Sequence, residues 1–135
     1  MAVALRLLGV RAHSRSELRS KLRRKGCAPD AIEAAVERLA GQGYLDDAAF
    51  AESLVSRRSA SRGPGAIAGE LAAKGIDRET ARAALAGTDR EAQLEAALRL
   101  AGRAGSRDSR VLAGRLIRRG FDWDVVREAC RQAKT

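Results

Sequence analysis

Three copies of one pattern run through this sequence: SELRSKLRRKG at residues 16–26, GAIAGELAAKG at 65–75 and RVLAGRLIRRG at 110–120. Each copy holds two apolar residues four positions apart, and each ends on a basic residue followed by glycine. The apolar pairs are Leu18/Leu22, Ile67/Leu71 and Leu112/Leu116. The copies begin 49 and 45 residues apart. A period of this length predicts tandem structural units.

The pattern describes a helix that ends at the glycine. Apolar residues at i and i+4 share one helical face. Glycine readily adopts the left-handed conformation that closes a helix, and a cation in the last turn offsets the negative end of the helix dipole. Apolar residues recur one, six and ten positions after each glycine, which predicts that another helix follows. They are Cys27, Ile32 and Val36; Ile76, Ala81 and Leu85; and Phe121, Val126 and Cys130.

Residue types that favour helix N-termini indicate where several helices begin. They are the capping-box pairs Ser14/Glu17 and Thr88/Glu91, the first-turn prolines Pro29 and Pro64, and the N-cap aspartates Asp77 and Asp122.

A further helix is predicted before each pair, over residues 2–12, 47–60 and 89–103, and no segment alternates with the period of a strand. The sequence therefore predicts an all-α protein built from three tandem three-helix repeats. We place these repeats at 1–45, 46–88 and 89–135. Because one such unit buries little apolar surface alone, neighbouring units should stack into an elongated, curved molecule.

The charge of the chain is strongly positive and uneven. The net charge is +9, with an excess of five positive groups in residues 1–45, a balance in 46–88 and an excess of four in 89–135. Such a field favours polyanions or acidic protein surfaces, although it also serves solubility. Aromatic residues are only 3% of the chain, so alanine and leucine must fill the cores between closely packed helices.

Several function classes lack the residues they need. Cys27 and Cys130 occupy otherwise apolar positions, which favours free thiols over a disulfide. A single histidine and no close cysteine pair leave no ligand set for zinc, and no phosphate loop or nucleophile–base motif is present. No apolar run approaches the ~20 residues of a membrane span. We expect a cytoplasmic protein with no catalytic residue, metal or cofactor.

Four motifs, in order and at fixed distances, carry a family resemblance. They are VRAHSRSEL at 10–18; GYLDD at 43–47 with Phe50, Ala51 and Arg57 after it; Gly63-Pro64 with Lys74-Gly75-Ile76; and RRGF at 118–121. Over nearly the whole chain they resemble the RecX regulatory family.

The resemblance implies a non-catalytic protein of three-helix repeats that lies in the groove of the RecA–single-stranded-DNA filament. It also implies contact with more than one RecA subunit and a lowering of RecA's ATP hydrolysis, strand exchange and co-protease activity, with a place in DNA repair, homologous recombination and the SOS response. An extended array of repeats suits such a partner, because it can reach several sites on a polymer at once. We expect a monomer that binds RecA and single-stranded DNA, and double-stranded DNA weakly.

A tandem helix-turn-helix DNA-binding protein is the alternative, since three-helix units with short turns also occur in that class. The basic residues argue against it, because many of them cluster at the C-terminal ends of the predicted helices rather than at the start of one recognition helix in each unit.

Eight arginines are the candidates for contact with RecA or DNA. The first three are four positions apart and share a helical face, which either meets a partner or only faces solvent. The others lie near predicted helix ends, where cations also stabilise the helix dipole, and the resemblance singles out Arg57 among them. The eight are Arg15, Arg19, Arg23, Arg57, Arg58, Arg62, Arg118 and Arg119.

Three further positions have structural interpretations. Asp46 and Asp47 are adjacent carboxylates directly before a predicted helix, so N-capping is favoured over acid–base or metal chemistry. Tyr44 and Leu45 are expected to fill the joint between the first two units. Trp123, in the first turn of the last helix, is expected to pack against the protein, with base stacking as the alternative.

Overall fold

In the computed structural model, residues 1–10, 12–106 and 108–133 are described, and every regular element among them is an α-helix. Arg11, part of the first family motif, lies outside these residues. The helices are α1 (Ala2–Val10), α2 (Arg15–Arg24), α3 (Pro29–Gly41), α4 (Asp47–Arg58), α5 (Pro64–Ala73), α6 (Arg78–Leu85), α7 (Arg90–Arg103), α8 (Ser109–Arg118) and α9 (Trp123–Ala133). The predicted all-α class is confirmed.

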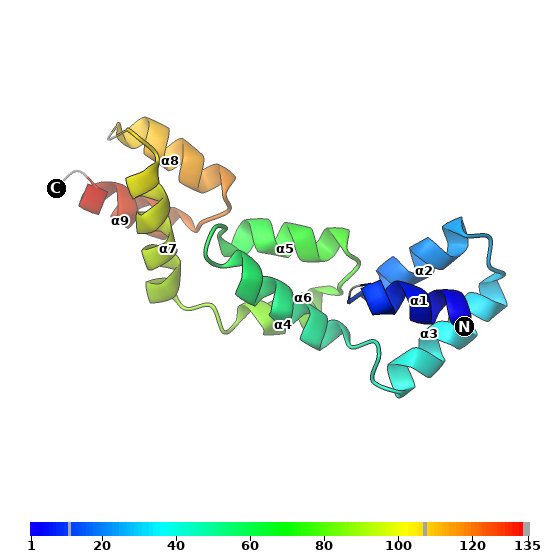
Figure 1. Ribbon diagram of the computed structural model, residues 1–135. Coiled ribbons are helices and arrows are strands. Elements are labelled where there is room, and N and C mark those ends of the chain that lie inside the picture. Colours follow the sequence, from blue (N-terminus) through cyan, green and yellow to red (C-terminus); the bar gives the residue numbers. More distant parts are fainter. Residues whose placement is uncertain (11, 107, 134–135) are drawn as a thin grey trace.

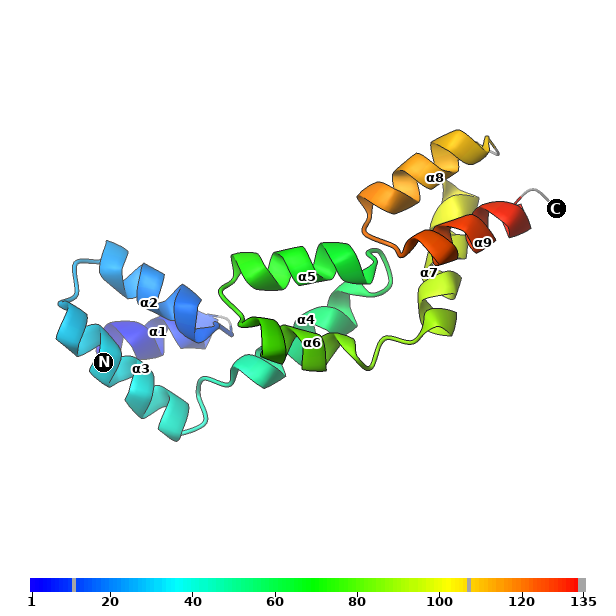
Figure 2. The ribbon, with the colours of Figure 1, turned by 180° about the vertical axis from the view of Figure 1, so that it is seen from behind.

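The helices form three groups that follow one another along an elongated molecule (Figures 1 and 2). We call them the first unit (α1–α3), the second unit (α4–α6) and the third unit (α7–α9). The N-terminus lies at one end of the molecule and the C-terminus at the other. The predicted boundaries at 45/46 and 88/89 remain a prediction.

Glycine ends the second helix of every unit, as the pattern predicts. Gly26, Gly75 and Gly120 have φ values of +86°, +77° and +89°. In each case the amide of the next residue donates to the carbonyl of the second apolar residue of the pattern, at N···O distances of 3.0 to 3.2 Å. This closure turns the chain sharply and sends it back as the third helix.

Most of the predicted helix starts are present. Ser14 and Glu17 form a reciprocal capping box, and Pro29 and Pro64 open α3 and α5. The side chain of Asp77 caps α6.

The predicted capping box of Thr88 is wrong by one position. Asp89 is the N-cap of α7 and accepts the Ala92 amide at 2.7 Å. Its carboxylate is the better cap because it carries a charge at the positive end of the helix dipole. Asp122 directly precedes α9, and its carboxylate accepts from the Gln93 side-chain amide at 3.1 Å.

Each unit has a hydrophobic cluster of its own, built around the apolar pair of its second helix. Leu18 and Leu22 lie in the first cluster, Ile67 and Leu71 in the second, and all four are buried. The third cluster is built around Leu112 and Leu116. Burying one such side chain contributes about 1.5 to 3 kcal/mol, so the interior of each unit depends on a few residues. The apolar interiors are therefore separate from one unit to the next.

Two expectations about aromatic residues are wrong. Tyr44 is 59% exposed, and Leu45 alone is buried, in the first cluster. Trp123 is 57% exposed, although the residue before it, Asp122, is held by two hydrogen bonds to the Gln93 side chain. The Arg127 guanidinium lies over the Trp123 ring, 5.8 Å from its centroid. Neither Cys27 nor Cys130 forms a disulfide, and Cys130 is buried.

Candidate interaction surface

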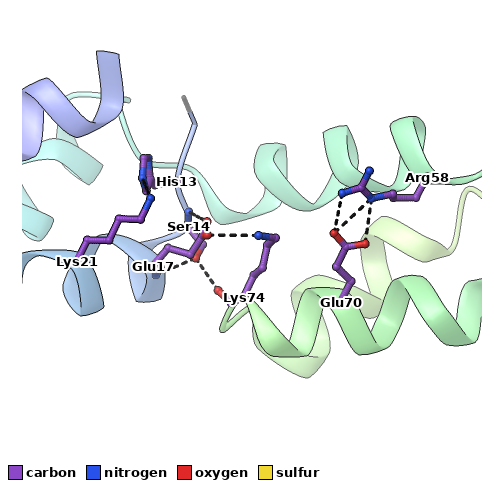
Figure 3. A network of polar contacts seen from close by, with 7 residues as sticks. All are labelled: His13, Ser14, Glu17, Lys21, Arg58, Glu70 and Lys74. Atoms are coloured by element: carbon purple, nitrogen blue, oxygen red, sulfur yellow. Dashed lines mark hydrogen bonds and ion pairs between the residues drawn. The ribbon is translucent and has the colours of Figure 1, made fainter. Parts of the chain in front are cut away.

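The first and second units meet where the end of α5 reaches the start of α2 (Figure 3). Ser14 Oγ donates to the Lys74 carbonyl at 2.6 Å and accepts the Glu17 amide at 3.1 Å. The Lys74 ammonium lies 3.4 Å from the Glu17 carboxylate. A Cβ on Gly75 would lie 2.2 Å from the Ser16 hydroxyl, so these two segments approach more closely than a side chain at position 75 would allow. We call this contact the first joint.

The second and third units meet at the equivalent place, between the end of α8 and the start of α5. The Gly63 amide donates to the Arg119 carbonyl at 2.7 Å, and the Gly65 amide donates to the Gly120 carbonyl at 2.9 Å. A Cβ on Gly120 would lie 2.2 Å from the Ala66 nitrogen. This second joint is therefore made by backbone against backbone, and it requires glycine.

The second helices of the three units consequently meet end to end. At each joint, the carbonyls at the C-terminus of one helix accept hydrogen bonds from groups at the N-terminus of the next helix. These are groups that an isolated helix leaves without partners, and opposite ends of helix dipoles attract. At the free end of the series, a Cβ on Gly26 would meet nothing within 4 Å among the described residues, unlike the glycines at the two joints.

The adjacent carboxylates at the start of α4 have structural roles. Asp46 is the N-cap of this helix and accepts the Ala49 amide at 3.1 Å. Asp47 reaches the first unit and accepts the Arg15 amide at 3.0 Å. The N-cap interpretation is thus right for Asp46, while Asp47 holds the start of α2 in place.

His13, directly before α2, is buried and its Nε2 lies 2.8 Å from the Lys21 ammonium. Because an ammonium can only donate, the ring nitrogen accepts this hydrogen bond. The contact fixes the chain as it enters the first joint.

Four of the eight candidate arginines are tied to other groups of the protein. Arg19 pairs with Glu33 of α3 at 2.8 Å. Arg58 and Arg62 both bind one carboxylate, which belongs to Glu70. Arg119 donates to the Ser61 carbonyl across the second joint at 3.2 Å.

The Glu70 carboxylate lies between Arg58 and Arg62. Arg58 binds it through two nitrogens, with distances of 3.0 Å from both Nε and Nη2, and Arg62 Nη1 lies at 2.9 Å (Figure 3 shows the Arg58 pair). The Glu70 side chain is only 17% exposed. The hydrogen bonds from Arg58 hold the pKa of Glu70 below its ordinary value of 4.5, and they raise the pKa of Arg58. These contacts connect the end of α4 to α5 and stabilise their packing.

The other four candidates, Arg15, Arg23, Arg57 and Arg118, are exposed and have no carboxylate partner among the described residues. Arg15 and Arg23 share the outward face of α2 with Arg19. Arg57 lies at the end of α4, and Arg118 lies at the end of α8. The eight candidates are thus spread along the molecule rather than gathered in one patch.

Two features are absent from the described parts of the chain. Within them, no three His, Cys, Asp or Glu side chains come together in a way that could hold a metal ion. None of the helices in these parts combines the length and apolar character needed to cross a bilayer.

Three further exposed arginines were not among the candidates chosen from the sequence: Arg78, Arg82 and Arg127. Arg82 and Arg127 occupy the same position of the repeat, and this equivalence is the signal that could have identified them.

The fold and its surface define a class of protein: a tandem array of three-helix units with a basic exterior. Models of known families match two parts of the chain, the first three-helix domain of RecX at residues 1–39 and the second three-helix domain of RecX at residues 46–85.

Similar proteins extend the match to almost the full length. The regulatory protein RecX of Xanthomonas campestris pv. campestris (strain B100) is 44% identical over 135 residues, which cover 95% of this chain and 83% of that protein. The regulatory protein RecX of Chromohalobacter salexigens is 45% identical over 137 residues, covering 96% and 90%. The crystal structure of RecX from Lactobacillus salivarius superposes with a TM-score of 0.89 at 25% identity, covering 98% of this chain and 92% of that one.

The chain belongs to the RecX family of regulatory proteins. This confirms the resemblance seen in the sequence. The family consists of regulators of RecA and not of enzymes, so the expectations of a regulatory and non-catalytic role are confirmed by membership.

Proposed function

We propose that this RecX-family regulator acts by lying along the RecA–single-stranded-DNA filament and restraining it. ATP hydrolysis, strand exchange and co-protease activity of RecA then fall together. The observation that carries the proposal is the end-to-end series of α2, α5 and α8, which makes a molecule long enough to touch several sites of a polymer. Several weak contacts on one extended body add effective concentration, so no single contact has to be strong.

The positions of the exposed arginines support the same mechanism. Arg15 and Arg23 lie on the first unit, Arg57 on the second and Arg118 on the third, so cationic groups occur along the whole length. Such groups attract phosphates of single-stranded DNA and acidic protein surfaces, and they accelerate the encounter. We place the protein in the cytoplasm with its partner, acting as a monomer, and we expect binding to double-stranded DNA to be weak.

The helix-turn-helix alternative requires the third helix of a unit to enter a DNA groove with its N-terminal turn. Asp30, Glu79 and Asp124 occupy the first turns of α3, α6 and α9. A carboxylate in that position repels phosphates, and it removes the positive helix end that such proteins direct at DNA. The filament mechanism is therefore preferred.

The decisive experiment is titration of the protein into RecA that is hydrolysing ATP on single-stranded DNA. We expect hydrolysis to fall at stoichiometric dose. No change at any dose would refute the proposal. A gel shift with random double-stranded DNA at several salt concentrations distinguishes the filament regulator from the helix-turn-helix alternative. Tight binding that prefers one palindromic sequence would support a transcription factor.

A charge-reversal variant tests the outward face of α2. Arg15→Glu combined with Arg23→Glu should weaken the inhibition about tenfold, since each lost phosphate or carboxylate contact contributes on the order of 1 kcal/mol. The matched control is Arg38→Glu combined with Arg99→Glu, which changes the net charge equally at exposed positions outside the candidate set. Circular dichroism should show both variants folded. Equal inhibition by the two variants would exclude a specific role for this face.

A further inference from the structure

The second unit has an open groove between α5 and α6, with a volume of about 590 Å³. Its apolar lining includes Ala72, Ile76 and Leu85, and two arginines of α6, Arg78 and Arg82, also line it. None of the α6 residues is fully buried, so the apolar side of this helix is only partly covered by its own unit. Exposed apolar surface between two helices is a candidate docking surface for another molecule.

The third unit has a groove at the equivalent place, between α8 and α9, with a volume of about 360 Å³. The two grooves correspond residue by residue at the repeat distance of 45. Six corresponding pairs line them: Ala68 and Ala113, Arg78 and Trp123, Ala81 and Val126, Arg82 and Arg127, Leu85 and Cys130, and Ala86 and Arg131. The same surface therefore occurs twice along the molecule, with an arginine in the same position.

In the first unit, an ion pair of the protein itself occupies the position that corresponds to the groove. Arg19 corresponds to Ala68, and Glu33 corresponds to Arg82. Their ion pair, with 2.8 Å between Arg19 Nε and the Glu33 carboxylate, joins α2 to α3 across the place where the other units have a groove.

The second unit has no such pair. Ala68 replaces the arginine on the second helix, and Arg82 replaces the carboxylate on the third. No described carboxylate pairs with Arg78 or Arg82. The groove thus combines an apolar floor with cations that have no partner.

We propose that the α5–α6 groove, together with its α8–α9 counterpart, docks an amphipathic helical segment of RecA that carries acidic residues. The inference rests on the proposed function and names the chemistry of the contact. Apolar side chains of the segment would cover Ala72, Ile76 and Leu85, while its carboxylates would pair with Arg78 and Arg82. A helix with an apolar face fits a groove of this kind through anchors three or four positions apart.

Protein is favoured over nucleic acid as the occupant because the lining between the arginines is alanine, isoleucine and leucine. These side chains give phosphates no hydrogen-bond donor. Two copies of the groove in successive units also match a filament, which presents one segment per subunit.

Two groove variants test the proposal in the full-length chain. Ala72→Trp fills the groove at an exposed position, and Arg78→Glu combined with Arg82→Glu reverses its charge. The controls are Ala83→Trp, at an exposed α6 position outside the groove lining, and the Arg38→Glu, Arg99→Glu pair. Binding is measured to RecA without DNA and, separately, to oligothymidylate.

We expect both groove variants to bind RecA about tenfold more weakly, as is usual when a contact at the centre of an interface is lost, while the controls and the binding to oligothymidylate stay unchanged. If both variants bind RecA with wild-type affinity, the proposal for the groove is wrong, but the proposed function on the filament is unaffected. Loss of oligothymidylate binding instead would identify the groove as a nucleic-acid site. A wild-type protein that neither binds RecA nor alters its ATP hydrolysis would overturn the proposed function itself.

The third-unit groove has its own probe, since Trp123 lines it and is the only tryptophan of the chain. Protein labelled with 5-fluorotryptophan gives one fluorine resonance. We expect this resonance to shift or broaden when unlabelled RecA is added, and to stay in place with oligothymidylate. No response to RecA would exclude the α8–α9 groove from the contact.

Discussion

The interiors of the units and the joints between them are held together differently. Each interior is a small apolar cluster in which leucine, valine and alanine side chains exclude water. The joints are made by capping groups, backbone carbonyls and glycines, with one ion pair between Lys74 and Glu17. Interiors of this kind resist solvent and tolerate little polarity. The joints fix the direction in which units follow one another, and their strength depends on close approach.

The two joints also differ from each other. At the first joint a side chain, Ser14, and an ion pair make the contact. At the second joint two backbone amides donate directly to two carbonyls, which is possible because Gly63 and Gly65 carry no side chain. The second joint should therefore be less sensitive to salt and more sensitive to any added side chain.

The largest effect is expected from a charge placed in an interior. Leu71→Asp puts a carboxylate in the fully buried centre of the second cluster, at a cost of several kcal/mol, on the order of the whole stability of one unit. We expect the second unit to unfold, with a clear loss of helical circular dichroism. Unchanged helix content and melting temperature would refute the assignment of Leu71 to an apolar core.

A smaller effect is expected at the second joint. There, a matched pair of variants separates the backbone strain of a left-handed residue from the loss of the contact between the units. Gly120→Ala and Gly26→Ala both place a side chain at a left-handed position, with φ of +89° and +86°, which costs about 1 kcal/mol each. Only Gly120→Ala also collides with Ala66, so it alone should open the joint.

The measurements are thermal unfolding and the radius of gyration from solution scattering. Gly120→Ala should melt lower than Gly26→Ala and change the radius of gyration. Identical behaviour of the two variants would show that the second joint does not hold the units together.

The smallest effect is expected from the Glu70 carboxylate. Its pKa is lowered in the folded protein, mainly by hydrogen bonds from Arg58, so its stabilisation is fully present above pH 4.5 and disappears as the pH falls through the folded value. Glu70→Gln should lower the stability at pH 7 by about 1 kcal/mol, because the bonds to Arg58 and Arg62 weaken.

The check is the difference in melting temperature between wild type and Glu70→Gln as a function of pH. This difference should shrink below pH 4.5. A constant difference across that range would mean that the ion pairs contribute nothing and that the change acts through packing.

Local structure was predictable where neighbouring residues decide it. The helices that end at Gly26, Gly75 and Gly120, and the capping box of Ser14 and Glu17, follow from spacings of a few residues. Thr88 shows the limit of this reasoning. Thr88 and Asp89 both suit an N-cap, and the spacing of Thr88 to Glu91 favoured the wrong one, because the charged Asp89 caps α7 in the structure.

The interaction surface was much less predictable, as the arginines show. Arg15, Arg19 and Arg23 share one helical face, yet Arg19 alone is paired, with a carboxylate of the next helix. Arg58 and Arg62 look like a basic cluster in the sequence, but in the structure they hold one carboxylate between them. A charge counted along the chain does not reveal whether it is already neutralised in space.

The sequence by itself determined three helical units, their register and their family, because helix periodicity and glycine closure act within a few positions of the chain. Only the tertiary structure decided how the units join, which described arginines are without a carboxylate, and that the second and third units have open grooves between their last two helices. These features depend on pairs such as Ser14 and Lys74, which lie 60 positions apart. Such distant residues meet only after the local helices have formed and packed.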